Sequence, residues 1–140
     1  MKPIPMITCE SVQASSGWYQ RVLGLVSAHG GDEYEMLTCG DDVVLQLHTV
    51  DVHEHIHVLD GDDGSRGNGV ALWFETAEFG AAAARIRAAG TAVTILEDVH
   101  VNPLANHLEV WLQDPDGYKV VISSPYGDVG DTVGGDRQTP

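Results

Sequence analysis

The chain repeats one order of secondary structure twice, and this duplication restricts its fold more than any other feature of the sequence. Each half is predicted to contain a strand, a helix that ends at a glycine, a further strand and a hairpin of two strands, over residues 3–50 and 69–124. Repetition at this scale indicates a duplicated structural unit rather than two unrelated halves. The order predicts an α+β domain made of two β-α-β-β-β modules.

Two short helices are predicted from capping residues and apolar periodicity. In the first helix, Ser15 and Ser16 are candidate N-caps before an apolar stripe, and Gly24 ends the helix. The second helix covers residues 79–89, includes four consecutive alanines and ends at Gly90.

Apolar alternation and turn residues predict the strands. The expected strands are residues 5–11, 34–38, 43–50, 70–76, 92–96, 108–112 and 118–123, with a hairpin turn at residues 114–117. Residues 51–68 form a long connector, and residues 126–140 form a Gly- and Asp-rich tail without core contacts. The predicted single domain therefore spans residues 1–125.

The charge balance excludes several classes of partner. Acidic residues outnumber Lys plus Arg by 21 to 7, which gives a formal net charge of −14. This charge repels phosphate backbones and anionic lipid, so we expect neither a nucleic-acid partner nor a membrane partner. The same field attracts a cationic ligand, although an acidic surface also serves solubility alone.

The expected compartment follows from the N-terminus and the cysteines. The first residues lack the apolar segment of a signal peptide, and no apolar run reaches the roughly 18 residues that would span a bilayer. Cys9 and Cys39 have no histidine or second cysteine at short spacing. We expect a cytoplasmic protein with free thiols.

Two segments resemble a known family. Residues 18–25, Trp-Tyr-Gln-Arg-Val-Leu-Gly-Leu, are similar to the first-helix signature of the vicinal-oxygen-chelate superfamily, and residues 114–118, Asp-Pro-Asp-Gly-Tyr, resemble its last hairpin. This superfamily contains glyoxalases, bleomycin-resistance proteins and dioxygenases. The resemblance implies the glyoxalase/bleomycin-resistance fold, in which two modules form a curved, cup-like mixed sheet.

The resemblance also implies four inward positions that carry His, Glu or Gln around one divalent metal in the enzymes of the superfamily. In this sequence they fall near Ile4, on Gln46, near Ala71 and on Val121. Only Gln46 has a donor atom, whereas a catalytic zinc site needs at least three. An alignment shifted by two residues would bring in His48 but would still supply one donor. We therefore expect no metal and no cofactor in this site.

Without a metal, the cup is expected to bind a small-molecule ligand. Strand parity and position select the residues that are expected to line the cup, which are Gln46, His48, Trp73, Trp111, His107 and Val121. Met6 is expected to add an apolar wall. Two indoles and few polar groups suit a planar or aromatic ligand that stacks. The alternative is that both tryptophans are ordinary core residues.

The remaining histidines lie outside this predicted cup. The connector contains three alternating histidines, His53, His55 and His57. In an extended segment their imidazoles would point the same way and could bind a metal. The alternative is that they belong to a polar, solvated loop. His29 and His100 are expected in turns or loops, without a functional signal.

Two strand carboxylates are weaker candidates. Glu75 and Glu109 are able to serve as bases or as counter-ions for a cationic ligand, or they are merely exposed strand residues.

Three function classes follow from these observations, because fold alone does not determine function. The first is a homodimeric binding protein that sequesters an aromatic or cationic ligand without a metal, by analogy with the bleomycin-binding relatives. The second is a divergent metal-dependent lyase, isomerase or dioxygenase of the same superfamily. The third is a scaffold without a small-molecule role.

Overall fold

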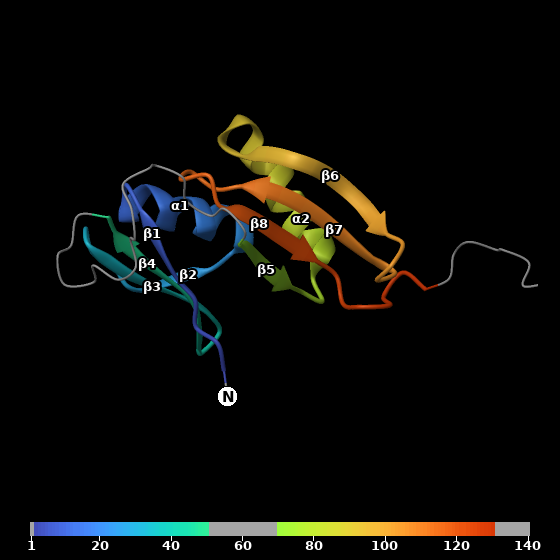
Figure 1. The fold of residues 1–140 in the computed structure, drawn as a ribbon, viewed down its shortest axis with the longest axis horizontal. Coiled ribbons are helices and arrows are strands. Elements are labelled where there is room, and N and C mark those ends of the chain that lie inside the picture. The colour runs from blue at the N-terminus through green and yellow to red at the C-terminus, as the bar shows by residue number, and fades with distance from the viewer. Residues whose placement is uncertain (1, 51–69, 131–140) are drawn as a thin grey trace, which may run out of the picture.

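The computed structural model describes residues 2–50 and 70–130, which form two four-stranded mixed sheets with one helix each (Figure 1). The strand orders are β1-β4-β3-β2 and β5-β8-β7-β6. In each sheet the first strand pairs in parallel with the last, and the other pairs are antiparallel. The predicted α+β class and the duplicated order are confirmed.

The two modules have closely matching elements. The first contains β1 (Met6–Cys9), α1 (Val12–Leu23), β2 (Val26–His29), β3 (Tyr34–Cys39) and β4 (Asp42–Thr49). The second contains β5 (Ala71–Glu75), α2 (Phe79–Ala89), a short 3-10 turn η2 (Gly90–Ala92), β6 (Thr94–Asn102), β7 (His107–Gln113) and β8 (Lys119–Ser123).

Helix α1 begins earlier than its apolar stripe indicates. Its N-cap is Ser11, whose hydroxyl accepts a hydrogen bond from the backbone N–H of Ala14. The expected N-caps, Ser15 and Ser16, are buried inside the helix, where their hydroxyls donate to carboxylates of other elements. The prediction of the start was wrong because these serines make tertiary hydrogen bonds, whereas Gly24 ends the helix as predicted.

The edge strands depart most from the predictions. β2 occupies the place that the duplicated order requires after the first helix, although its four exposed residues show no apolar pattern that predicts a strand. β6 extends to Asn102, well beyond the predicted end at residue 96. His29 and His100 lie in these two strands, so their expected turn or loop positions were wrong. Edge strands exposed on both faces lack the alternation that identifies half-buried strands.

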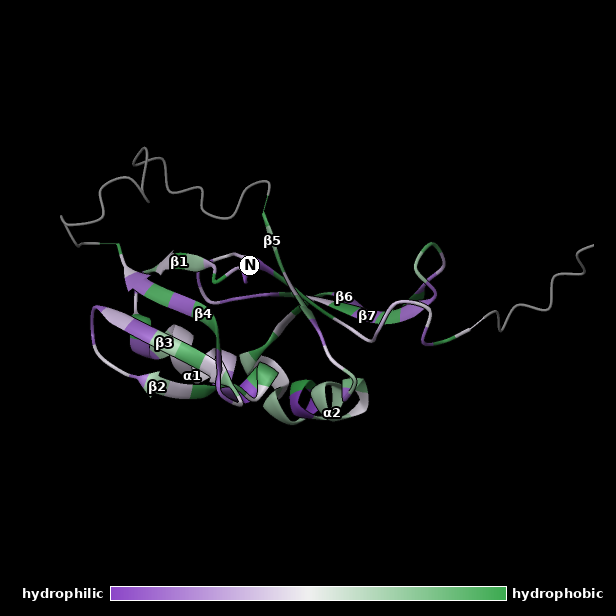
Figure 2. Cartoon of the chain, turned by 90° about the horizontal axis from the view of Figure 1, so that it is seen from below, coloured by the Kyte–Doolittle hydropathy of each residue, from purple (hydrophilic) through white to green (hydrophobic). Residues whose placement is uncertain are grey.

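One face of each sheet is covered by a helix, and Figure 2 shows α1 and α2 together on the same side of the molecule. Tyr19 and Val22 of α1, with Ala82 and Ile86 of α2, are buried in a common hydrophobic core. Arg85 of α2 joins the helices by donating to the backbone carbonyls at the end of α1. The α-helices of the described residues are α1 and α2, and neither is long and apolar enough to cross a membrane.

The hairpin turn before β8 connects the two modules. Asp114 is 4% exposed and accepts a hydrogen bond of 2.9 Å from the Tyr19 hydroxyl of α1. Its second oxygen accepts from the backbone N–H groups of Asp116 and Tyr118. Burial raises the pKa of Asp114 above its usual value, although these hydrogen bonds oppose the increase. The turn is therefore fixed to the first helix.

Both cysteines are free: Cys9 is buried and Cys39 is exposed. Burial raises the pKa of the Cys9 thiol to about 11, which leaves it protonated and unreactive near neutral pH.

The first residues of the predicted tail bond to the loop before β7. The backbone N–H of Gly127 donates to the carbonyl of Ala105, and that of Val129 donates to the carbonyl of Asn106. Tyr126 nevertheless stays 77% exposed, so this segment adds no large side chain to the core.

Candidate functional site

The second sheet carries two tryptophans on the face that α2 does not cover. Strand register places Trp73 of β5 and Trp111 of β7 on either side of Val121 of β8. Val121 is fully buried, whereas Trp73 is 45% exposed. The two indole rings meet edge to face with their centroids 5.8 Å apart. The three residues therefore share one face, as strand parity predicts, and their indoles form an apolar surface that solvent reaches.

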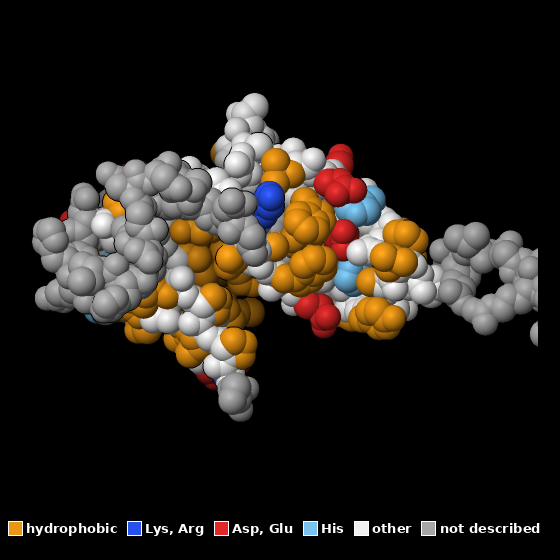
Figure 3. Space-filling view, in the orientation of Figure 1, with side chains coloured by type: hydrophobic (Ala, Val, Ile, Leu, Met, Phe, Trp, Pro, Cys, Tyr) orange, Lys and Arg blue, Asp and Glu red, His pale blue; other side chains and the backbone are white. Residues whose placement is uncertain are grey.

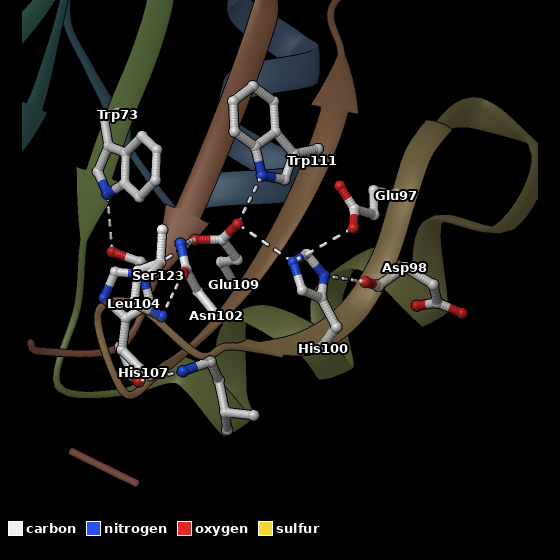
Figure 4. A network of polar contacts seen from close by, with 12 residues as sticks. Trp73, Glu97, Asp98, His100, Asn102, Leu104, His107, Glu109, Trp111 and Ser123 are labelled. Atoms are coloured by element: carbon white, nitrogen blue, oxygen red, sulfur yellow. Dashed lines mark hydrogen bonds and ion pairs between the residues drawn. The ribbon is translucent and has the colours of Figure 1, made fainter. Parts of the chain in front are cut away.

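A buried carboxylate lies beside these indoles. Glu109 precedes Trp111 by two residues on β7 and is only 4% exposed. One of its oxygens accepts from Trp111 Nε1 at 2.9 Å and lies 3.1 Å from His100 Nε2. The other accepts from Asn102 Nδ2 at 3.1 Å and lies 2.9 Å from His107 Nε2 (Figure 4). Figure 3 shows the same mixture of hydrophobic, acidic and histidine side chains over this sheet.

These donors keep Glu109 ionised. Burial alone would raise its pKa, but the hydrogen bonds from Trp111, Asn102 and His107, together with the positive charge of His100, lower the pKa to about 2. A carboxylate surrounded by donors has its charge stabilised even when it is removed from water. Glu109 is thus a fixed negative charge beside the two indoles.

His100 provides the matching positive charge. Its Nδ1 lies 2.8 Å from the backbone oxygen of Asp98, and its Nε2 faces carboxylate oxygens of Glu109 at 3.1 Å and Glu97 at 3.4 Å. These oxygens only accept hydrogen bonds, so both ring nitrogens must donate and the ring is an imidazolium. The hydrogen bond to Asp98 and the charges of both carboxylates raise the pKa of His100, although burial opposes the increase.

His107 completes the group from the start of β7. Its Nε2 donates to Glu109, and its ring centroid lies 6.0 Å from that of Trp73. Trp73 in turn donates its indole N–H to the Ser123 hydroxyl at 2.8 Å. The term "indole–carboxylate cluster" below denotes Trp73, His100, His107, Glu109 and Trp111.

The other two predicted site residues lie on the first sheet. Gln46 and His48 share a face of β4. The Gln46 amide accepts from the Tyr34 hydroxyl at 2.7 Å and donates to the Ile4 carbonyl at 3.3 Å. His48 is 7% exposed, and its ring lies 6.0 Å from that of Tyr34. The structure thus brings together Trp73, Trp111, His107 and Val121, and it places Gln46 and His48 in the other module.

At the four positions where the family resemblance implies a metal, the side chains do not fit one. Ile4, Ala71 and Val121 have no donor atom, and Val121 is packed between two strands. The Gln46 amide is already engaged on both sides. Within residues 2–50 and 70–130, no group of three His, Cys, Asp or Glu side chains has a metal-binding arrangement. The connector histidines, His53, His55 and His57, lie outside the described residues.

The central residue of the cluster was underestimated from the sequence. From the sequence, Glu109 was a candidate base or counter-ion, or an exposed strand carboxylate, and the structure contradicts the exposed alternative. The loop position expected for His100 was wrong. The usable signal was spacing, because a residue two positions before Trp111 shares its face of the strand. His100 and Asn102 were missed because β6 was expected to end before them.

Comparison with known proteins places this fold in a family. A family model described as the Glyoxalase/Bleomycin resistance protein/Dioxygenase superfamily matches residues 4–122. No curated protein matches the chain. Similar solved structures include TioX from Micromonospora sp. ML1, at 13% identity and a TM-score of 0.69, covering 89% of this chain and 98% of that one.

Two further solved structures show the same fold. A glyoxalase-related enzyme from Fulvimarina pelagi is 18% identical with a TM-score of 0.71, covering 89% of this chain and 87% of that one. A lactoylglutathione lyase from Agrobacterium tumefaciens is 16% identical with a TM-score of 0.64, covering 89% and 92%. These structures share the fold of the chain, and the family match over residues 4–122 shows that it belongs to the glyoxalase/bleomycin resistance protein/dioxygenase superfamily.

Proposed function

We propose that this chain binds a planar, cationic aromatic small molecule on the open face of its second sheet, without a metal. The observation that carries the proposal is the indole–carboxylate cluster, in which two solvent-accessible indoles lie beside a buried, ionised carboxylate. Aromatic faces attract planar rings and cations together. A binding function of this kind needs no catalytic metal.

The hydrogen-bonded placement of both indoles supports binding. Trp111 donates its N–H to Glu109 and Trp73 donates its N–H to Ser123, so a hydrogen bond anchors each ring. A surface that is ordered before the ligand arrives loses less conformational entropy on binding. Trp18, by contrast, is 3% exposed in the core, where a large aromatic side chain has a purely structural role.

The His100 imidazolium offsets the charge of Glu109, and the further carboxylates around the cluster favour a cation. Besides Glu109, Glu75 of β5 is exposed and Glu97 of β6 has a side chain that is 60% exposed, at the two edges of the same sheet. The formal net charge of −14 acts in the same direction over longer distances. The nearby carboxylates and the net charge of the chain would both repel an anionic ligand.

Isothermal titration calorimetry with two probes of nearly equal shape tests the proposal. One is 4-aminoquinoline, which is a planar cation at pH 7, and the other is 1-naphthylamine, which is uncharged. We expect the cation to bind more tightly, and Trp111→Leu to weaken its binding about tenfold, the equivalent of about 1.4 kcal/mol. Tyr126→Ala is the matched control, because Tyr126 is an exposed aromatic outside the cluster.

Two results would contradict this function. The first is equal or absent binding of both probes to the native protein. The second is a stoichiometric divalent metal in protein purified without a histidine tag, if that metal is lost when Gln46 or His48 is substituted. The second result would favour the alternative, a divergent metal-dependent lyase, isomerase or dioxygenase.

We also propose that the protein acts as a homodimer. The supporting observation is β6, an edge strand on which Ile95, Leu96, Val99 and Val101 are all between 38% and 47% exposed. Edge strands with exposed apolar residues readily pair with a second copy. Multi-angle light scattering should give twice the chain mass of 15.0 kDa, and Val101→Lys should reduce it to the monomer. A native protein that is monomeric at micromolar concentration contradicts this.

A further inference from the structure

The indole–carboxylate cluster contains one buried polar atom that has no partner. His107 is 7% exposed, and its Nδ1 has no hydrogen-bond partner among the described residues. Among the described residues, every other buried side-chain nitrogen or oxygen has a hydrogen-bond partner. A buried polar atom left without a hydrogen bond is costly, so its presence beside a candidate binding surface requires an explanation.

We infer that His107 Nδ1 accepts a hydrogen bond from an N–H or O–H group of the bound ligand, which makes His107 a specificity-determining residue. The inference rests on the proposed function and adds a chemical requirement to it. The ligand would be an aromatic cation that carries a donor at the edge of its ring system, such as a protonated ring nitrogen. Fully alkylated cations would lack this donor.

The surrounding hydrogen bonds determine which nitrogen is the acceptor. Glu109 is ionised and only accepts, so the nitrogen that faces it, His107 Nε2, must carry a hydrogen. His100 already supplies an imidazolium opposite the same carboxylate. When Nε2 donates its hydrogen to Glu109, an uncharged imidazole ring carries its lone pair on Nδ1. The carboxylate thus holds the ring in the tautomer that accepts from a ligand.

The Trp73 indole lies beside the His107 ring. The Nδ1 nitrogen itself is buried, and the ring centroids of Trp73 and His107 lie 6.0 Å apart. Trp73 is 45% exposed and its indole is held by a single hydrogen bond to Ser123. A ligand ring that stacks on the indole surface and shifts Trp73 would bring its own edge toward the imidazole. Binding energy from stacking would then be combined with a directional hydrogen bond.

A pair of equally charged probes tests the inference. 4-Aminoquinoline has N–H donors as a cation, whereas 4-(dimethylamino)-1-methylquinolinium is a cation of the same ring system without any donor. We expect the native protein to prefer 4-aminoquinoline about tenfold by calorimetry, and His107→Phe to abolish that preference while it retains binding of both. Ser27→Ala is the control variant, because Ser27 lies on β2 in the other module.

A second measurement uses the native protein, so it does not depend on the variant's folding. Nitrogen-15 NMR of the His107 ring should identify the Nε2–H tautomer, and the Nδ1 resonance should shift on addition of 4-aminoquinoline but not of the methylated probe. Equal affinity for both probes, or an unmoved Nδ1 resonance on binding, overturns the inference and leaves the proposed function standing. Failure of both probes to bind overturns the two together.

Discussion

Trp111 donates its indole N–H to a carboxylate oxygen of Glu109 at 2.9 Å, although the two residues are only two positions apart on β7. This contact fixes the orientation of an aromatic ring by means of a buried charge. It also couples the stability of the second sheet to the protonation of the cluster, so substitutions there have measurable consequences.

Glu109→Gln should destabilise the protein by about 1–3 kcal/mol, because a neutral amide that brings its own N–H groups cannot accept from all four surrounding donors. Urea unfolding followed by tryptophan fluorescence measures this. Glu97→Gln is the control, since Glu97 is exposed and its loss should cost less than about 0.5 kcal/mol. Equal effects of the two substitutions would mean that Glu109 has no special structural role.

Acid should remove the contribution of Glu109. Its pKa lies at about 2 in the folded protein and at 4.5 ordinarily, so its stabilisation is complete above pH 4.5 and is lost as the pH falls toward 2. The free energy of unfolding of the native protein should therefore decrease over that interval more steeply than that of Glu109→Gln. Parallel curves for the two proteins would contradict the low pKa.

His100 should have the opposite pH dependence. Its folded-state pKa is raised above 6.5, so its stabilisation is complete below pH 6.5 and is lost as the pH rises through the folded value. We expect His100→Gln to flatten the decline in the free energy of unfolding on the alkaline side of pH 6.5. The test is urea unfolding at several pH values, and an unchanged slope in His100→Gln would exclude the imidazolium.

Gly24→Ala should destabilise the protein by more than the cost of placing a side chain on a left-handed backbone. Gly24 has φ of 69°, and an added Cβ would lie 3.2 Å from the guanidinium carbon of Arg85, which caps the helix. Left-handed backbone costs a side chain about 1–2 kcal/mol. Gly40→Ala isolates that cost, because Gly40 has φ of 58° and open space around it. Thermal unfolding should show a larger loss of stability for Gly24→Ala than for Gly40→Ala. Equal losses would mean that the contact with Arg85 adds no cost.

Tyr19→Phe should cost about 1–3 kcal/mol, because it leaves the buried Asp114 carboxylate without its side-chain donor. Tyr118→Phe is a matched control, since the Tyr118 hydroxyl has a longer contact, of 3.3 Å, with the neutral Thr8 hydroxyl. Calorimetric unfolding should separate the two variants, and a larger effect of Tyr118→Phe would contradict the coupling of the modules through Asp114.

The fold was predictable because its signals are local and repeated. Gly24 and Gly90 ended both helices, and the turn at residues 114–117 fixed the last hairpin. Edge strands β2 and β6 were harder, since residues that face solvent on both sides follow no apolar alternation.

The site was predictable only in part. Parity placed Trp73, Trp111 and Val121 together, because side-chain direction alternates along a strand. Parity does not show which polar residue is buried. The burial of Glu109 depends on hydrogen-bond donors from the neighbouring strand β6. The hydrogen bonds of His100 and Asn102 to Glu109 cross from β6 to β7, so only the three-dimensional structure shows them.

The three indole N–H signals in a proton–nitrogen NMR spectrum test the central claim most directly. Titration with 4-aminoquinoline should shift the signals of Trp73 and Trp111, while the signal of Trp18, which is 3% exposed in the core, stays in place as an internal control. Three unmoved signals, or a shift confined to Trp18, would contradict a binding surface on the second sheet.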